Sequence, residues 1–129
     1  MQIDEVISEL GKVIGAKSLR INKHGVVHLT IDYVGDLFID ERSPGTNAHS
    51  VLVYLLRIYE FPTAKLYEQA MLLCDYKNDY PFLVNPVLHK EQALGFAVKF
   101  RAEDFSTRNL YQAIETLQNM QDKLGNSAK

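Results

Sequence analysis

The sequence predicts an α+β fold in the order αβββαββα, with an antiparallel sheet packed against helices. Apolar residues recur at helical spacing near both ends of the chain, they alternate with polar residues in several segments between, and one more helical segment separates the strands into two groups. The length of 129 residues, with 47% hydrophobic and 23% charged residues, is typical of a soluble globular protein with one domain, residues 1–129.

Residues 2–15 have the pattern of an amphipathic helix. Asp4 and Glu5 in its first turn suit the positive end of the helix dipole, and Gly15 is placed to end it. The apolar positions recur every three or four residues and predict one buried face: Ile3, Val6, Ile7, Leu10, Val13 and Ile14.

Alternating apolar and polar residues predict two strands after the first helix. Residues 26–33 place Val27, Leu29, Ile31 and Tyr33 on one face, and residues 37–41 form a second strand after a tight connection at 34–36. Residues 42–49 contain Ser, Pro, Gly, Thr and Asn, and we expect a mobile loop there.

The apolar run 51–59 lacks alternation, which fits a central strand covered on both faces or a strand near a subunit contact. A buried helix is the alternative. Thr63 is a plausible N-cap for a helix that continues to about Tyr76. Residues 82–89 read as an edge strand because Pro86 lacks a backbone N–H, and they should form a hairpin with 93–101. Asp104 or Ser106 then caps a last helix with an apolar stripe at Leu110, Ile114, Leu117 and Leu124.

Charge and cysteine content narrow the functional classes. Fourteen basic and 16 acidic residues give a net charge of −2, so we expect no nucleic-acid partner. With Cys74 alone, no intrachain disulfide can form, which favours a reducing cytoplasm. The acidic N-terminal residues differ from a signal peptide, and the longest apolar run, residues 51–56, is too short for a membrane span.

Catalytic, metal and cofactor sites are not predicted. Cys74 falls on an apolar helix face, so a buried thiol is favoured over a nucleophile. His24 and His28 lack the Cys or carboxylate partners of a metal site and fit surface histidines. The glycines are scattered, so no phosphate-binding loop is expected. A group of acidic residues fits a solvated sheet edge better than a cation site: Asp32, Asp36, Asp40 and Glu41.

The element order and several segments resemble the class I type III secretion chaperones, the CesT-like (Tir-chaperone-like) family. The segments are the opening helix ending at Val13-Ile14-Gly15, the strand 27–32, the end of the central strand at 59–62, the strand 93–98 and the final helix. The resemblance covers nearly the whole chain and is one of pattern, because the family lacks a strict motif. It implies a dimeric, ATP-independent, non-enzymatic cytosolic chaperone that keeps a secreted effector or regulator competent for export.

By this resemblance, one patch on the first helix and first strands would bind an extended N-terminal segment of the client. Its expected members are Ile3, Val6, Ile7, Val27, Leu29, Leu37 and Ile39. The alternative is that these residues form the core, since every helix must bury one face.

The second helix and central strand resemble the family's dimer element. The expected interface residues are Tyr54, Leu56, Leu66, Tyr67, Ala70, Met71 and Cys74. Many members are strongly acidic, so the net charge of −2 leaves both a homodimer and a heterodimer with a second small chaperone open. The rival functions are an adaptor domain unconnected to secretion and a small-ligand-binding domain with a closed apolar cavity.

Overall fold

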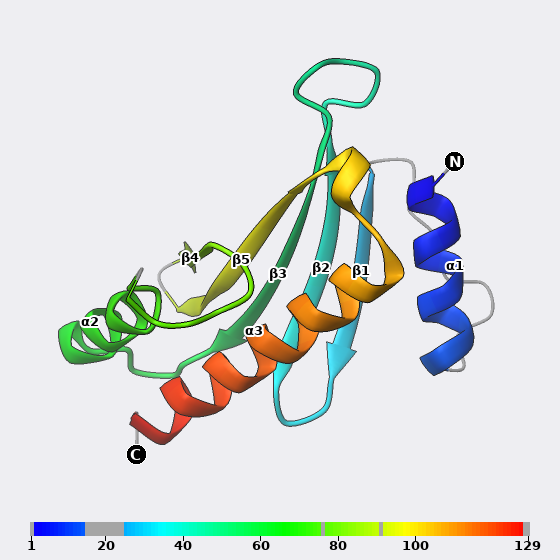
Figure 1. Ribbon diagram of the computed structural model, residues 1–129. Coiled ribbons are helices and arrows are strands. Elements are labelled where there is room, and N and C mark those ends of the chain that lie inside the picture. The colour runs from blue at the N-terminus through cyan, green and yellow to red at the C-terminus, as the bar shows by residue number, and fades with distance from the viewer. Residues whose placement is uncertain (1, 15–24, 76, 91, 128–129) are drawn as a thin grey trace.

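The computed structural model of the chain describes residues 2–14, 25–75, 77–90 and 92–127. The predicted order αβββαββα is confirmed, with one short 3-10 helix added before the last helix (Figure 1). The elements are α1 (Gln2–Ile14), β1 (Val26–Ile31), β2 (Gly35–Arg42), β3 (Ser50–Ile58), α2 (Ala64–Leu73), β4 (Val84–His89), β5 (Ala93–Arg101), η1 (Ala102–Asp104) and α3 (Thr107–Ser127). Gly15 and His24 lie outside the described residues.

The five strands form one antiparallel sheet in the order β1-β2-β3-β5-β4. β1 and β4 are therefore its two edges, as Figure 1 shows. The expected hairpin of β4 with β5 is present, with Val84 opposite Val98, and Pro86 lies on an edge strand as its missing N–H requires.

The segment 50–58 is the central strand β3, and the alternative of a buried helix is excluded. It pairs with β2 on one side and with β5 on the other. Val51, Val53 and Leu55 are fully buried on one face, whereas Leu52 and Tyr54 on the other face are half-buried. Partial burial of the second face explains why the sequence alternates so weakly here.

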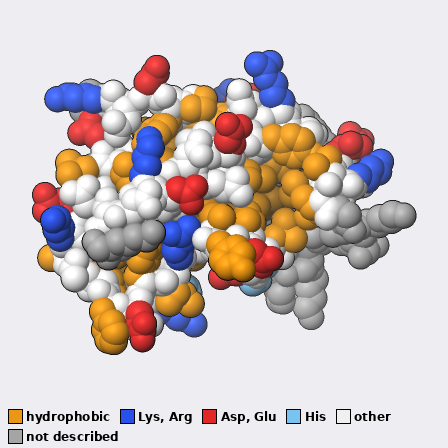
Figure 2. Space-filling model, turned by 90° about the horizontal axis from the view of Figure 1, so that it is seen from below, with side chains coloured by type: hydrophobic (Ala, Val, Ile, Leu, Met, Phe, Trp, Pro, Cys, Tyr) orange, Lys and Arg blue, Asp and Glu red, His pale blue; other side chains and the backbone are white. Residues whose placement is uncertain are grey.

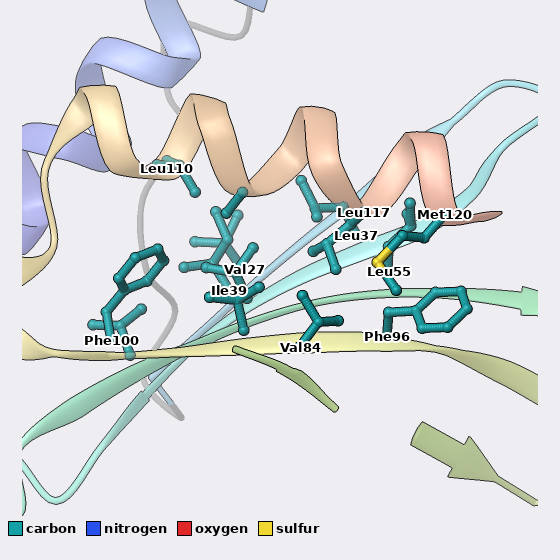
Figure 3. Packing of buried hydrophobic residues seen from close by; sticks show 14 of the residues in the cluster. Val27, Leu37, Ile39, Leu55, Val84, Phe96, Phe100, Leu110, Leu117 and Met120 are labelled. Atoms are coloured by element: carbon teal, nitrogen blue, oxygen red, sulfur yellow. The ribbon is translucent and has the colours of Figure 1, made fainter. Parts of the chain in front are cut away.

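α3 crosses one face of the sheet and forms the main core with it. Figure 3 shows Leu110, Leu117 and Met120 directed from the helix toward the strands. Ser106 caps the helix, because its Oγ accepts a hydrogen bond from Asn109 N at 3.1 Å. The helix runs on to Ser127, three residues beyond Leu124, the last residue of the predicted stripe.

A buried polar bridge joins α3 to the sheet. The fully buried Gln121 donates through Nε2 to Leu55 O at 3.1 Å and Leu94 O at 2.8 Å, and its Oε1 accepts from Tyr59 Oη at 2.9 Å. Gly95 leaves room for this bridge, since an added Cβ would lie 1.9 Å from Leu55 O and 3.0 Å from Gln121 Nε2. The bridge therefore fixes α3 over β3 and β5.

The turn between β1 and β2 differs from the prediction. β1 ends at Ile31, and Tyr33, expected in the strand, adopts a φ of 65° in the turn. Arg57 of β3 holds this turn through Nε to Val34 O at 2.6 Å and Nη2 to Tyr33 O at 3.2 Å. Gly35 has a φ of 150° and approaches Leu56 O too closely for a side chain, so β2 begins at a glycine.

α2 packs against α3 and β4. Thr63 is its N-cap, as predicted, with Oγ1 accepting from Leu66 N at 3.2 Å. The helix ends at Leu73, before the expected end at Tyr76, and Asn78 Nδ2 donates to the carbonyls of Leu72 and Leu73 there. No helix in the described part of the chain has the length and apolar character needed to cross a membrane.

Candidate protein-binding surfaces

An apolar groove lies between the C-terminal end of α1, the end of β1 and the middle of α3. Its volume is about 470 Å³. The apolar lining residues are Leu10, Ile14, Leu29, Ile31, Leu37 and Ile114, with Thr30, Asp32 and Gln118 beside them. In Figure 2, hydrophobic side chains surround a hollow toward the right of the view, and the hollow opens onto the surface. The groove thus offers aliphatic contacts to a partner without a closed cavity.

The residues expected to bind the client divide into two groups. Two of them line this groove, namely Leu29 and Leu37. Leu29 is half-buried, and Leu37 is buried at the bottom of the groove. The other five are buried in the core and do not line the groove: Ile3, Val6, Ile7, Val27 and Ile39. They are buried because the apolar face of α1 and the inner face of β1 and β2 join the cluster formed with α3.

Several groove residues were not among the predicted client contacts. Leu10 and Ile14 continue the apolar stripe of α1 toward its C-terminal end, and Ile31 is the next inward residue of β1 after Leu29. Ile114 belongs to the predicted stripe of α3. Periodicity therefore identified the correct faces, but it gave no signal for which end of each face stays uncovered.

β1 is an edge strand beside the groove, and no strand of the described part of the chain pairs with it on the side away from β2. Glu41 N donates to Gly25 O at 2.7 Å, next to the Val26–Asp40 pair that begins the β1–β2 ladder. Hydrogen-bonded and non-hydrogen-bonded pairs alternate along an antiparallel ladder, so Val27, Leu29 and Ile31 direct their backbone groups to β2. The backbone groups of His28 and Thr30 point to the free edge. An added strand can therefore hydrogen-bond here and direct alternate side chains into the groove.

A row of stacked rings crosses the opposite face of the sheet from α3. His28, Phe38 and Tyr54 occupy matching positions on β1, β2 and β3. The ring centroids of His28 and Phe38 lie 4.5 Å apart at an interplanar angle of 6°, and those of Phe38 and Tyr54 lie 4.9 Å apart at 13°. We call this the ring row.

Neighbouring polar groups orient the histidine of the ring row. His28 Nε2 lies 3.1 Å from Asp36 Oδ1, and Thr30 Oγ1 donates to the same oxygen at 2.9 Å. The hydrogen bond with His28 lowers the pKa of Asp36 below its ordinary value, against the opposing effect of partial burial, and Thr30 contributes to the lowering. The carboxylate is thus held in its charged form.

A second apolar surface lies around α2 and β4. Met71 on α2 is 66% exposed and Leu83, just before β4, is 74% exposed. Leu72 and Leu88 are also exposed large hydrophobics. A hollow of about 310 Å³ separates the end of α2 from the start of β4, with Cys74, Tyr80, Phe82 and Leu83 in its lining. Exposed apolar side chains on adjoining elements are typical of a surface that another protein covers.

The expected interface residues do not form one surface. Met71 is exposed, and Tyr67 and Cys74 are half-buried, on or next to α2. Leu66 and Ala70 are buried in the core, because α2 turns these positions inward. Tyr54 lies in the ring row and Leu56 on the same face of β3, away from the inner face where α3 packs. Leu72, Leu83 and Leu88 were not predicted, since exposed apolar residues give no periodic signal.

The acidic residues and Cys74 have structural roles. Three of the four carboxylates of the predicted acidic group form separate pairs, Asp36 with His28, Asp40 with Arg42 at 3.0 Å and Glu41 with His49 at 2.7 Å. Within the described ranges, no group of three or more His, Cys, Asp or Glu side chains could hold a metal ion. Burial raises the pKa of the Cys74 thiol to about 11, which keeps it protonated at neutral pH and makes it a poor nucleophile.

The arrangement of helices and sheet is shared with solved structures. A chain from the complex of the Yersinia pestis type III secretion chaperone SycH with a stable fragment of YscM2 matches with a TM-score of 0.66 and 15% identity, over 94% of this chain and 98% of that one. A chain of the HopA1–SchA chaperone–effector complex matches with a TM-score of 0.68 and 14% identity, over 95% and 91%. The fold is that of the type III secretion chaperones.

Another solved structure also shares the fold at low sequence identity. A chain of the heterodimeric ExoU–SpcU complex from the type III secretion system of Pseudomonas aeruginosa gives a TM-score of 0.64 at 13% identity, over 95% of this chain and 93% of that one. No family model and no curated protein matches this sequence. The likeness therefore lies in the fold, and it extends over nearly the full length of both chains.

Proposed function

We propose that this chain is a cytosolic, ATP-independent chaperone of a bacterial type III secretion system. It binds an extended segment near the N-terminus of a secreted effector or secretion regulator and keeps that protein competent for export. The observation that carries this proposal is the fold, which is shared with chaperones solved in complex with an effector or with the fragment of another protein.

The groove and the β1 edge support binding of an extended client. A strand added to β1 would gain backbone hydrogen bonds at His28 and Thr30. Every second side chain would then enter the groove beside Leu29 and Ile31. β4 is the less suitable edge because Pro86 offers no backbone N–H. Such binding requires apolar surface and a free edge, and no reactive group, so we propose a non-enzymatic function.

The two rival functions, a small-ligand-binding domain and an adaptor domain, require different surface features. A small-ligand-binding domain needs an enclosed apolar cavity with converging polar groups. The groove opens to the surface and its lining is mainly aliphatic, which favours a protein segment (Figure 2). An adaptor unconnected to secretion would use the same geometry, so the identity of the partner separates it from the chaperone.

We place the contact with a second small chaperone subunit at the exposed apolar surface of α2 and β4. Met71, Leu72, Leu83 and Leu88 supply that surface, and Tyr67 and Cys74 lie beside it. It is distant in the sheet order from the β1 edge, since β1 and β4 are opposite edges. A dimer formed there leaves the groove free for the client. Both a homodimer and a heterodimer fit this surface.

The direct test is purification of the tagged chain from its native host, with mass spectrometry of each co-purifying protein and light scattering of the complex. We expect one secreted protein, bound through its N-terminal region, and two small chaperone subunits. A partner without any link to secretion would favour the adaptor, and a lone monomer without protein partners would contradict the proposal.

A matched pair of variants tests the groove in the same purification. Ile14 lines the groove and is 49% exposed, whereas its neighbour Val13 is 68% exposed and is not part of the lining. Ile14→Asp should reduce client binding by about tenfold or more, because the client's apolar side chain would bury an unpaired charge. Val13→Asp should bind as the unaltered chain does. Equal loss in both variants would argue against the groove as the client site.

A further inference from the structure

We propose that the ring row selects an aromatic residue in the client, at the position paired with His28 when the client adds a strand to β1. This inference rests on the proposed function, because it assumes that an extended client binds at that edge. It specifies the client sequence as an aromatic residue flanked on both sides by aliphatic residues.

The ring row is open at its β1 end. One face of the His28 ring stacks on Phe38, and the His28 side chain is 52% exposed. His28 is on an edge strand, and no described strand lies beyond it, so an added strand would supply the next position of the row. The contacts with Asp36 and Phe38 fix the ring in place before a client arrives.

The other end of the row offers no comparable site. Tyr54 is followed across the sheet by Ala97 on β5 and Asn85 on β4, and neither has a ring. The row is therefore a run of three rings that ends at β1, beside the groove. The stacking geometry can be continued in one direction only.

Register connects the ring row with the groove. In an added strand, the residue opposite His28 lies on the same face of the sheet as the ring row. Its two neighbours lie opposite Val27 and Leu29, on the groove face. Hydrogen-bonded pairs have Cα atoms about 5.5 Å apart, which brings an aromatic side chain within stacking distance of His28. One client strand can thus place aliphatic side chains on the groove face and an aromatic side chain against the ring row.

Designed peptides test this selection. Fluorescein-labelled peptides of twelve residues would carry Ile-X-Leu at the centre of a Thr and Lys background, with X as Tyr, Arg or Ala. Anisotropy titrations with the full chain give the dissociation constants. The Tyr peptide should bind roughly two- to tenfold more tightly than the Ala peptide. His28→Ala should reduce that ratio to about one, as expected when the stacking partner is removed.

The matched control is His89→Ala, which removes an exposed histidine from the other edge strand and should leave the ratio unchanged. Circular dichroism checks that both variants fold. Three outcomes would each overturn the inference while leaving strand addition intact. The unaltered chain could bind the Tyr and Ala peptides equally, or it could prefer the Arg peptide alone. The preference for Tyr could also persist in His28→Ala. Failure of every peptide to bind would contradict strand addition at β1 and the inference together.

Discussion

Single residues fix the relation between the last helix and the sheet. Gln121 satisfies two backbone carbonyls and the hydroxyl of Tyr59 inside the core. The sequence contained a signal for this burial, because Gln121 is four residues after Leu117 and three before Leu124 on the apolar stripe. Because glutamine is polar, it was not counted as part of that stripe. Its partners could not be predicted because they come from β3, β5 and the chain just after β3.

Replacing Gln121 should destabilise the fold. In Gln121→Leu, the buried hydroxyl of Tyr59 loses its acceptor and the two carbonyls each lose one donor, so unfolding should become easier by about 1–3 kcal/mol. Urea unfolding followed by circular dichroism measures this. Gln112→Ala, at an exposed position of the same helix, is the control and should change stability by less than about 0.5 kcal/mol. Similar losses in the two variants would contradict the role of the bridge.

Asp36 should contribute a pH-dependent share of stability. Its pKa is lowered in the folded chain from an ordinary value of 3.8, so the unfolded state binds more protons in that range. The contribution is complete above the ordinary value and is lost as the pH falls through the folded pKa. Asp36→Asn should therefore lose less stability than the unaltered chain between neutral pH and the acid range.

Urea titrations at several pH values measure this dependence. Asp32→Asn in the adjoining turn removes an acidic group but keeps the bonds of Asp36 to His28 and Thr30, and it should retain the dependence of the unaltered chain. If Asp36→Asn behaves as Asp32→Asn does, the hydrogen bonds around Asp36 have no thermodynamic effect.

At the scale of elements, the sequence pattern predicted the three α-helices and four of the strands, and left β3 open between a strand and a buried helix. It did not predict which part of each apolar face stays uncovered. Ile3, Ile7 and Ile14 share one stripe of α1, yet the first two are buried in the core and the third borders the groove. The position of α3 decides this, and sequence spacing holds no information about it. The same applies to α2, where Ala70 is buried and its neighbour Met71 is exposed.

The exposed side of α2 should control assembly. In Met71→Glu, two like charges would face each other if copies of the chain meet at this surface, which should shift a dimer toward monomer. Light scattering over a range of concentrations gives the mass. Val13→Glu adds the same charge at an equally exposed apolar position on α1 and should leave the mass unchanged. A dimer that survives Met71→Glu would exclude α2 as the contact.

At the scale of the whole molecule, element order and apolar pattern identified the fold although identity with the compared chains is only 13–15%. Pattern was sufficient because burial on a sheet or helix requires apolar character at fixed intervals and tolerates many side chains. The surfaces were predicted less well. The β1 edge, the groove and the α2–β4 surface each combine elements that are distant in sequence, so they follow from packing rather than from any local segment.

The central claim is that a client adds a strand to the β1 edge. Amide hydrogen exchange of the chain, alone and with the client purified from the host, tests it most directly. We predict slowed exchange at the amides of His28 and Thr30, which point to the free edge, and little change in β4. Slowed exchange in β4 with β1 unaffected, or no change at either edge, would contradict the claim.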